Sequence, residues 1–372
     1  IDNYSYQENI LPKYHVKLGF DVTVIASLVS FNSEGKGCLL PNSGEYMSND
    51  GYKVVRMNYR KWPSLRFCKR FRLYTSTYTL LKREKPDILF IHGTSFGDIT
   101  QVCKYLRKHP AIKVYADSHA DWINSGRNWL SLQVLHKIIW KHYTQMLLPY
   151  LQRIYGVLPI RCQFLTDIYG VPRDMIELLP LGVDDDAIPQ NRQQVRSKIR
   201  KEFGVLDDDI VIITGGKINN LKRIHYLMKA VNELNSVRVR LFIFGTIADD
   251  FRKEFEENLS DKITFVGWSS PMQIINYMLA SDIACFPGTH SILWEQAVGL
   301  SLPCIFRDWK GIHHVNVNGN CIFLKEDSVN AIIEAIEQML EPSFYSKIRE
   351  LASVAAGNFL YSNISKKAIG LY

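Results

Sequence analysis

The feature that most constrains the fold is a regular alternation of short apolar runs with helix-like spacers along most of the chain. The runs are rich in Val, Ile and Phe, as buried strands are, and the spacers carry apolar residues at helical spacing. Such alternation predicts parallel strands joined by crossover helices, and so an α/β fold. The expected strands are residues 21–26, 53–57, 87–91, 112–116, 209–214, 240–244, 263–266, 283–286 and 303–306.

The length of 372 residues predicts two domains rather than one core. The polar stretch 185–194 separates two segments with the same alternation of strands and helices. We therefore expect Rossmann-like, doubly wound domains at 1–183 and 184–342. A helical segment at 343–372 is expected to pack back toward the first domain. A Rossmann half begins with a strand, whereas this chain opens on a helix-like segment, so the first strand is expected to be missing. The expected helices are 8–18, 130–155, 162–172, 224–234, 271–280 and 328–340.

Cysteine usage and hydropathy limit the location of the protein. The seven cysteines are odd in number and never spaced CxxC, which fits neither a disulfide framework nor a zinc site. No apolar stretch approaches the roughly 18–20 residues that span a bilayer, and no signal-peptide pattern is present. The sequence therefore predicts a cytoplasmic protein whose contact with a membrane, if any, is peripheral.

A basic, aromatic stretch at residues 60–73 concentrates much of the net charge of +8. A solvated helix face is one interpretation, since charge runs are weak evidence. The interleaved Trp62, Phe67 and Phe71 favour an anionic lipid surface instead. A nucleic-acid partner is not expected, because the pI of about 9.0 comes without a recognisable binding module. The basic residues are Arg60, Lys61, Arg66, Lys69, Arg70 and Arg72.

Two Gly-containing segments follow expected strands of the second domain. In the first, Gly215 and Gly216 allow close approach of a ligand to the backbone, and Lys217 and Lys222 supply positive charge that suits a diphosphate. Such a turn is also common in loops that bind nothing. In the second, the loop amides can bind phosphate oxygens and the following Glu295 can accept hydrogen bonds from a ribose diol. That loop contains Gly288, Thr289, His290 and Ser291.

These residues resemble the motifs of family 4 retaining glycosyltransferases, which have the GT-B fold, two Rossmann-like domains facing a central cleft. Lys217 stands where the family usually has arginine, Lys222 matches the family's lysine, and Glu295 matches the second glutamate of its E-x7-E motif. The first glutamate is replaced by Pro287, which leaves the donor sugar open. A branch of polysaccharide-assembly transferases has a similar PGTHS…WEQA loop.

Polar residues also follow two expected strands of the first domain. His92 ends one strand, and Asp117, His119 and Asp121 follow the next. A lone histidine is more often structural, but the resemblance places an acceptor-side histidine at His119. The spacing of Asp117, His119 and Asp121 also fits metal ligands. No metal is expected, because GT-B enzymes neutralise the leaving diphosphate with lysines and loop amides.

The resemblance implies a metal-independent, retaining hexosyltransferase without a cofactor, whose donor is a nucleotide diphosphate-sugar such as a UDP-sugar. Lys217, Lys222 and the loop 288–291 would hold the diphosphate, Glu295 the ribose, and His119 would act on the acceptor. The N-terminal domain would bind a lipid-linked glycan on the inner face of the plasma membrane, in capsule or O-antigen biosynthesis. A non-catalytic sugar-nucleotide-binding or scaffolding paralogue is the alternative.

Overall fold

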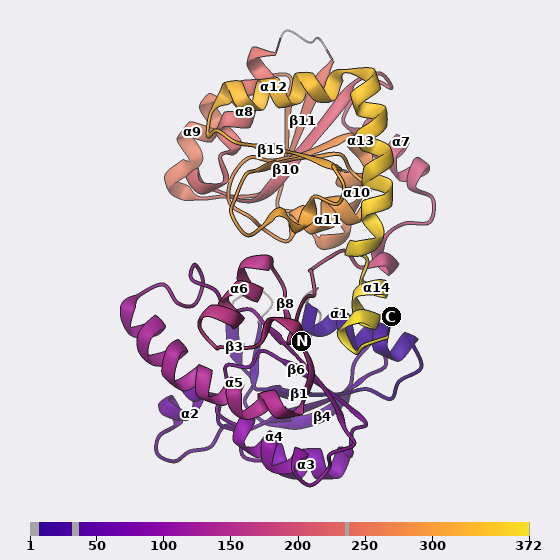
Figure 1. Cartoon of the computed structure of the whole chain (residues 1–372). Helices are drawn as coiled ribbons and strands as arrows, with labels where there is room; N and C mark the ends of the chain where they lie inside the picture. Colours follow the sequence, from indigo (N-terminus) through magenta and orange to yellow (C-terminus); the bar gives the residue numbers. More distant parts are fainter. Residues whose placement is uncertain (1–6, 32–36, 235–237, 372) are drawn as a thin grey trace. The chain divides into compact units, whose positions relative to one another are not determined.

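The computed structural model describes residues 7–31, 37–234 and 238–371, and the chain divides into two compact units (Figure 1). One unit comprises Ile1–Pro180 together with Ile364–Tyr372, and the other comprises Leu181–Asn363. The division lies close to the predicted boundary at 183. Only the last nine residues of the predicted segment 343–372 join the N-terminal unit, because helix α13 (Pro342–Ala355) lies within the C-terminal one.

The C-terminal unit is built on a six-stranded sheet of order β12-β11-β10-β13-β14-β15, with every pairing parallel. The strand order reverses between β10 and β13, which is the topological switch point of a doubly wound Rossmann sheet. The strands are β10 (Ile210–Ile218), β11 (Val239–Ile247), β12 (Ile263–Gly267), β13 (Ile283–Phe286), β14 (Cys304–Arg307) and β15 (Cys321–Leu324).

Helices cover both faces of this sheet (Figure 1), which is why its strands read as continuous apolar runs. Along β10, Ile212 packs in one core cluster, whereas Val211 and Ile213 pack in the cluster on the opposite face. The helices are α7 (Arg192–Glu202), α8 (Ile224–Glu233), α9 (Arg252–Glu257), α10 (Pro271–Ala280), α11 (Leu293–Gly299), α12 (Val329–Leu340) and α13.

The N-terminal unit contains two separate sheets of orders β1-β5-β4 and β6-β7-β8-β9, and a hairpin of β2 and β3. The β6–β9 sheet is parallel, whereas β4 runs antiparallel to β5. A strand before Ile1, as the sequence predicts, lies outside the described residues. The strands are β1 (Thr23–Ser27), β2 (Val29–Phe31), β3 (Gly37–Leu39), β4 (Gly44–Met47), β5 (Lys53–Met57), β6 (Ile88–His92), β7 (Lys113–Ser118), β8 (Leu151–Gly156) and β9 (Ile176–Leu178).

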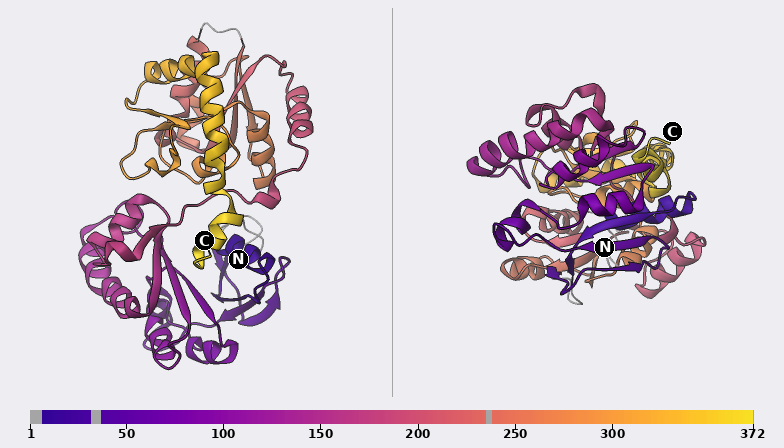
Figure 2. Two further views of the ribbon diagram at one scale, coloured as in Figure 1. Left: turned by 45° about the vertical axis from the view of Figure 1, so that its right-hand side comes forward. Right: turned by 90° about the horizontal axis from the view of Figure 1, so that it is seen from below.

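Residues from Ile364 onward pack in the N-terminal unit. Helix α14 (Tyr361–Ala368) lies beside helix α1 (Gln7–Lys17) (Figure 2), where the His15 ring is 2.9 Å from the carbonyl of Ser365. The Tyr155 hydroxyl donates to the carbonyl of Lys367 at 2.7 Å. The remaining α-helices of this unit are α2 (Leu65–Phe71), α3 (Thr77–Glu84), α4 (Ile99–Leu106), α5 (Lys141–Leu147) and α6 (Pro159–Asp167).

One predicted helix is wrong at its C-terminal end. The predicted segment 130–155 is helical only to Tyr150, as a π-helix at Ser131–Trp140, then α5, then a 3-10 turn at Leu148–Tyr150. Pro149 cannot donate a backbone hydrogen bond, and the chain turns into strand β8 directly after it. Strand β8 occupies the centre of the parallel sheet, and Ile154 is fully buried there.

Candidate functional site

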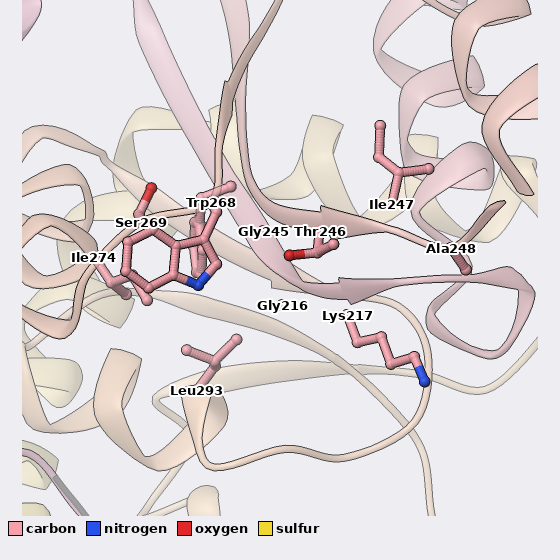
Figure 3. Close-up of a pocket in the computed structure, with 11 residues that line it drawn as sticks. Gly216, Lys217, Gly245, Thr246, Ile247, Ala248, Trp268, Ser269, Ile274 and Leu293 are labelled. Carbon is pink, nitrogen blue, oxygen red and sulfur yellow. The ribbon is translucent and has the colours of Figure 1, made fainter. Parts of the chain in front are cut away.

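A pocket of about 500 Å³ lies at the carboxyl ends of β10, β11 and β12 in the C-terminal unit (Figure 3). The carboxyl edge of a doubly wound sheet is where such folds bind ligands, and this volume is within the range of small-molecule sites. Its lining includes Gly216, Lys217, Gly245, Thr246, Trp268 and Leu293.

Glycines allow β10 and β11 to approach each other closely at the wall of this pocket. Strand β10 continues past the predicted end at 214 as far as Ile218, so Gly215 and Gly216 pair with Phe244 and Gly245 of β11. A side chain on Gly215 or Gly245 would overlap backbone atoms of the neighbouring strand, and Gly245 has a positive φ of 124°. The two strands therefore require glycine there whatever the ligand.

Two residues that line the pocket, Lys217 and Trp268, have exposed side chains that could contact a ligand. The Lys217 side chain is exposed and, among the described residues, its ammonium has no hydrogen-bond partner. Trp268 follows β12 and exposes 75% of its surface, although an indole of this size is usually buried. Figure 3 shows the indole and the Lys217 side chain on opposite sides of Gly216. A cation and an aromatic face at one strand edge can contact a phosphate and a flat heterocycle respectively.

Lys222, which the sequence predicts to bind phosphate, contacts backbone carbonyls in the structure. Its ammonium donates to the carbonyls of Thr289 at 2.7 Å and His290 at 3.2 Å, so it holds the loop that the sequence assigned to phosphate. Burial lowers the pKa of Lys222 to about 8. A side chain on Gly288 would overlap the backbone of Leu221 and Lys222, so the two predicted segments are packed together.

Glu295 is fully buried and contacts two histidines. Its Oε1 lies 2.8 Å from His290 Nε2 and 3.0 Å from His314 Nε2, and its Oε2 is buried without a hydrogen-bond partner among the described residues. Burial would raise the pKa of Glu295, but the two histidines outweigh it and hold the pKa at about 2. In this arrangement the carboxylate presents no surface to a ribose, so its partners differ from the predicted ones.

His92, Asp117 and His119 lie together at the carboxyl ends of β6 and β7 in the N-terminal unit. The buried Asp117 Oδ2 is 2.8 Å from His92 Nδ1 and 3.4 Å from His119 Nε2, while Asp117 Oδ1 accepts from the amide of Gly93 at 2.8 Å. Burial alone would lower the pKa of His92, but the charge of Asp117 raises it to about 9. The two histidines hold the pKa of Asp117 well below its usual range against the effect of burial.

The geometry of this trio permits a metal, since one ligand atom from each residue lies within 4.8 Å of the others. That no metal binds therefore stays a prediction. Asp121 lies outside the trio, because its carboxylate accepts from the amides of Ile123 and Asn124 and pairs with Arg161 at 3.0 Å. These partners give Asp121 a structural role in the turn after β7, in place of the predicted contact with an acceptor.

The basic residues of the stretch 60–73 are exposed, in and around helix α2, with the exception of Arg60. Trp62, Leu65 and Phe67 expose 84%, 47% and 43% of their surfaces in and before α2. Arg60 instead pairs with the buried Asp98 at 2.8 Å and so belongs to the fold. The side chains of Lys61, Arg66, Lys69, Arg70 and Arg72 are exposed.

Sequence reasoning missed Trp268, Gly245 and His314. Gly245 and Trp268 each lie at the end of an apolar run that the sequence does predict, and an aromatic residue directly after Gly267 is a usable signal. His314 lies in a 3-10 turn after β14, far along the chain from Glu295, and nothing in its spacing indicates the contact.

Comparisons with known proteins agree with this architecture. Residues 195–353 match the model of the glycosyl transferases group 1, and residues 11–187 match that of glycosyltransferase family 4. A solved glycosyltransferase from Rickettsia africae superposes with a TM-score of 0.68 at 16% identity, covering 98% of this chain and 93% of that one.

Two curated relatives share part of the chain. The UDP-Gal:alpha-D-GlcNAc-diphosphoundecaprenol alpha-1,3-galactosyltransferase of Escherichia coli is 24% identical over 70% of this chain and 65% of its own length. The alpha-galactosylglucosyldiacylglycerol synthase of Streptococcus pneumoniae is 21% identical over 49% of this chain and 52% of its own length. The chain thus spans less than two thirds of either relative. With both of its domains matched by transferase models, the chain belongs to the family 4 glycosyltransferases of the GT-B fold.

Proposed function

We propose that this protein transfers a hexose from a nucleotide diphosphate-sugar, most simply a UDP-sugar, to a lipid-linked glycan. The observation that carries this proposal is the pocket at the ends of β10–β12, where the exposed Lys217 and Trp268 are free to contact a ligand. The Escherichia coli relative uses UDP-Gal and an acceptor on diphosphoundecaprenol, as its name states.

In this proposal the nucleobase stacks on the Trp268 indole and the diphosphate lies against Lys217. Stacking suits an exposed indole, and an unpaired ammonium stabilises negative charge that develops on the leaving diphosphate. The transfer is proposed to retain the anomeric configuration and to need no metal. His119, fixed by the Asp117 carboxylate, would position or deprotonate the acceptor hydroxyl.

The acceptor is proposed to come from a membrane surface. The structure contains no helix long and apolar enough to cross a bilayer among the described residues. Helix α2 combines exposed Leu65 and Phe67 with Arg66, Lys69 and Arg70, the composition of an interfacial helix that binds anionic lipid. We place the protein on the inner face of the plasma membrane, in the assembly of a surface polysaccharide such as a capsule or O-antigen.

A screen of nucleotide sugars for thermal stabilisation tests the donor half of the proposal, because a ligand that binds only the folded state raises Tm. UDP and at least one UDP-sugar should raise Tm, and Lys217→Ala should reduce the shift. A protein that no nucleoside diphosphate stabilises would contradict the donor site.

A further inference from the structure

The trio at the ends of β6 and β7 directs two imidazoles at one carboxylate oxygen. His92 Nδ1 and His119 Nε2 lie 2.8 and 3.4 Å from Asp117 Oδ2, and the centroids of the two rings are 4.6 Å apart. Two imidazoles and a carboxylate form a ligand set that suits divalent transition metals such as zinc. The spacing in the sequence pointed to Asp121 as the third ligand, whereas the structure supplies His92 from the neighbouring strand.

The distances within the trio need little change to hold an ion. At bond lengths of about 2.0–2.2 Å, the ligand atoms of a tetrahedral zinc site lie about 3.3–3.5 Å apart. Here one ligand atom from each residue lies within 4.8 Å of the other two. The His92 and His119 side chains are each 36% exposed, so a small rotation of either ring can bring the two nitrogens closer.

Two members of the trio also have the outer partners that orient ligands in metal sites. The other nitrogen of His92, Nε2, lies within ion-pair distance of the Glu8 carboxylate of helix α1, at 3.8 Å, and a metal-bound histidine typically has such a carboxylate behind it. The other oxygen of Asp117, Oδ1, accepts from the amide of Gly93 at 2.8 Å. These contacts leave His92 Nδ1 and Asp117 Oδ2 directed at the centre of the trio.

The carboxylate at the centre of the trio attracts a cation. Asp117 is fully buried, and the two histidines that face it compensate its charge. A metal ion would supply that positive charge in place of a proton on an imidazole, since metal ligands bind in their deprotonated form. The exposed side of the trio leaves a further coordination position open to water, as in zinc sites with three protein ligands.

We propose that His92, Asp117 and His119 bind one divalent transition-metal ion of the zinc class, and that the bound ion inhibits the transfer. With Nε2 of His119 on the ion, the remaining ring nitrogen carries its hydrogen and cannot accept a proton from the acceptor hydroxyl. The inhibition rests on the proposed function, whereas the metal site rests on the contacts alone. The transfer itself stays metal-independent, and only the expectation that no metal binds at the trio is replaced.

Calorimetry with chelator-treated protein tests the metal site without any need for activity. The wild type should bind one equivalent of Zn²⁺, and Mg²⁺, which prefers oxygen ligands, should show no measurable binding. His92→Gln and His119→Gln should each weaken zinc binding by about 100-fold or more, because loss of an outer partner alone costs about 10- to 100-fold. His142→Gln is the matched control, since it changes an exposed histidine of the same unit and should bind zinc like the wild type.

Either histidine variant of the trio suffices, provided that its melting curve shows a folded protein. A wild type that binds no zinc, or a folded variant of the trio with wild-type zinc affinity, would overturn the metal site.

The inhibition is measured as transfer of labelled sugar with and without zinc. Zinc should inhibit the wild type at a concentration near its calorimetric Kd, and a chelator should restore the transfer. Any transfer that His92→Gln retains should not respond to zinc at that concentration. One equivalent of bound zinc without loss of transfer would overturn the inhibition. Failure of the proposed function looks different, because then the chelator-treated protein would bind zinc but transfer no sugar, which would support the metal site and remove its inhibitory role.

Discussion

The two lysines predicted to bind the donor phosphates differ in what they contact. Lys217 and Lys222 were predicted together as phosphate ligands, yet Lys217 is exposed and Lys222 is bonded to two loop carbonyls. The sequence places both lysines after the same strand, but it cannot show which carbonyls lie within reach. That depends on how the loop at Gly288 packs against the backbone of Leu221 and Lys222.

The two lysines should therefore respond differently to substitution. Lys217→Ala should leave Tm unchanged and lower turnover by about 100-fold or more, because one contact to developing charge is typically worth about 3–4 kcal/mol. Lys222→Ala leaves two partly buried carbonyls without a donor and should destabilise the fold by about 1–3 kcal/mol. Thermal unfolding and steady-state kinetics of both variants measure this. Equal melting temperatures for the two would contradict the assignment.

The exposed Trp268 indole is proposed to stack on the nucleobase of the donor, which substitution can test. Removal of a stacking indole costs about 1–3 kcal/mol of binding energy, so Trp268→Ala should weaken UDP binding by about 5- to 150-fold without changing Tm. Trp129 is a matched control, since it is 73% exposed and lies in the N-terminal unit. Trp129→Ala should bind UDP like the wild type. Unchanged UDP affinity in Trp268→Ala would remove the indole from the site.

His92 makes the stability of the N-terminal unit depend on pH. Its pKa is about 9 in the folded protein and about 6.5 in an unfolded chain. The stabilisation from this raised pKa is complete below about pH 6.5 and is lost as the pH rises through 9. His92→Gln should therefore melt below the wild type at pH 6, and the difference should shrink by pH 9.5. A difference that is constant over this range would show that the charge of His92 is not involved.

Among the secondary-structure elements, the predictions were accurate where a single apolar or helix-like segment of the sequence corresponded to a single strand or helix. The expected strands at 53–57 and 283–286 and the helix at 271–280 have the observed bounds. Strand β8 was missed because it follows the helical turn at Leu148–Tyr150 directly, so its apolar residues extended the helical pattern. The predicted end of strand β10 was too early, because Gly215 and Gly216 are typical of a turn in the sequence. Only their pairing with β11 shows that the strand continues through them.

Helix α2 carries the exposed face that we propose binds the membrane. Changing Arg66, Lys69 and Arg70 together to Glu should abolish binding to anionic vesicles and leave Tm unchanged, because each basic residue near such a surface contributes about 1 kcal/mol. Arg60 and Arg72 are left intact, since each donates to a partner within the fold.

A matched variant on α7 tests whether net charge alone explains the result. Arg192, Lys198 and Lys201 are exposed on that helix, and changing them to Glu alters the net charge equally. Sedimentation with phosphatidylglycerol vesicles should show nearly normal binding of the α7 variant. Equal losses in both variants would assign the effect to net charge rather than to α2.

At the scale of the whole molecule, the α/β alternation and the resemblance were enough to predict the GT-B fold, which the two domain models and the solved transferase structure bear out. The partners of Glu295 could not be predicted in the same way. Its contact with His314 joins helix α11 to the 3-10 turn after β14, and such a contact depends on how β13 and β14 bring these two segments together.

The proposed reaction is the transfer of a sugar from a nucleotide diphosphate to a lipid-linked acceptor. The most direct measurement incubates the purified chain with radiolabelled UDP-galactose, UDP-glucose or UDP-N-acetylglucosamine, together with N-acetylglucosaminyl-diphosphoundecaprenol. Label should appear in the lipid fraction with at least one donor, should depend on the acceptor, and should be strongly reduced in Lys217→Ala. A protein that binds UDP but neither transfers nor hydrolyses any of these donors would contradict the catalytic claim and favour the non-catalytic alternative.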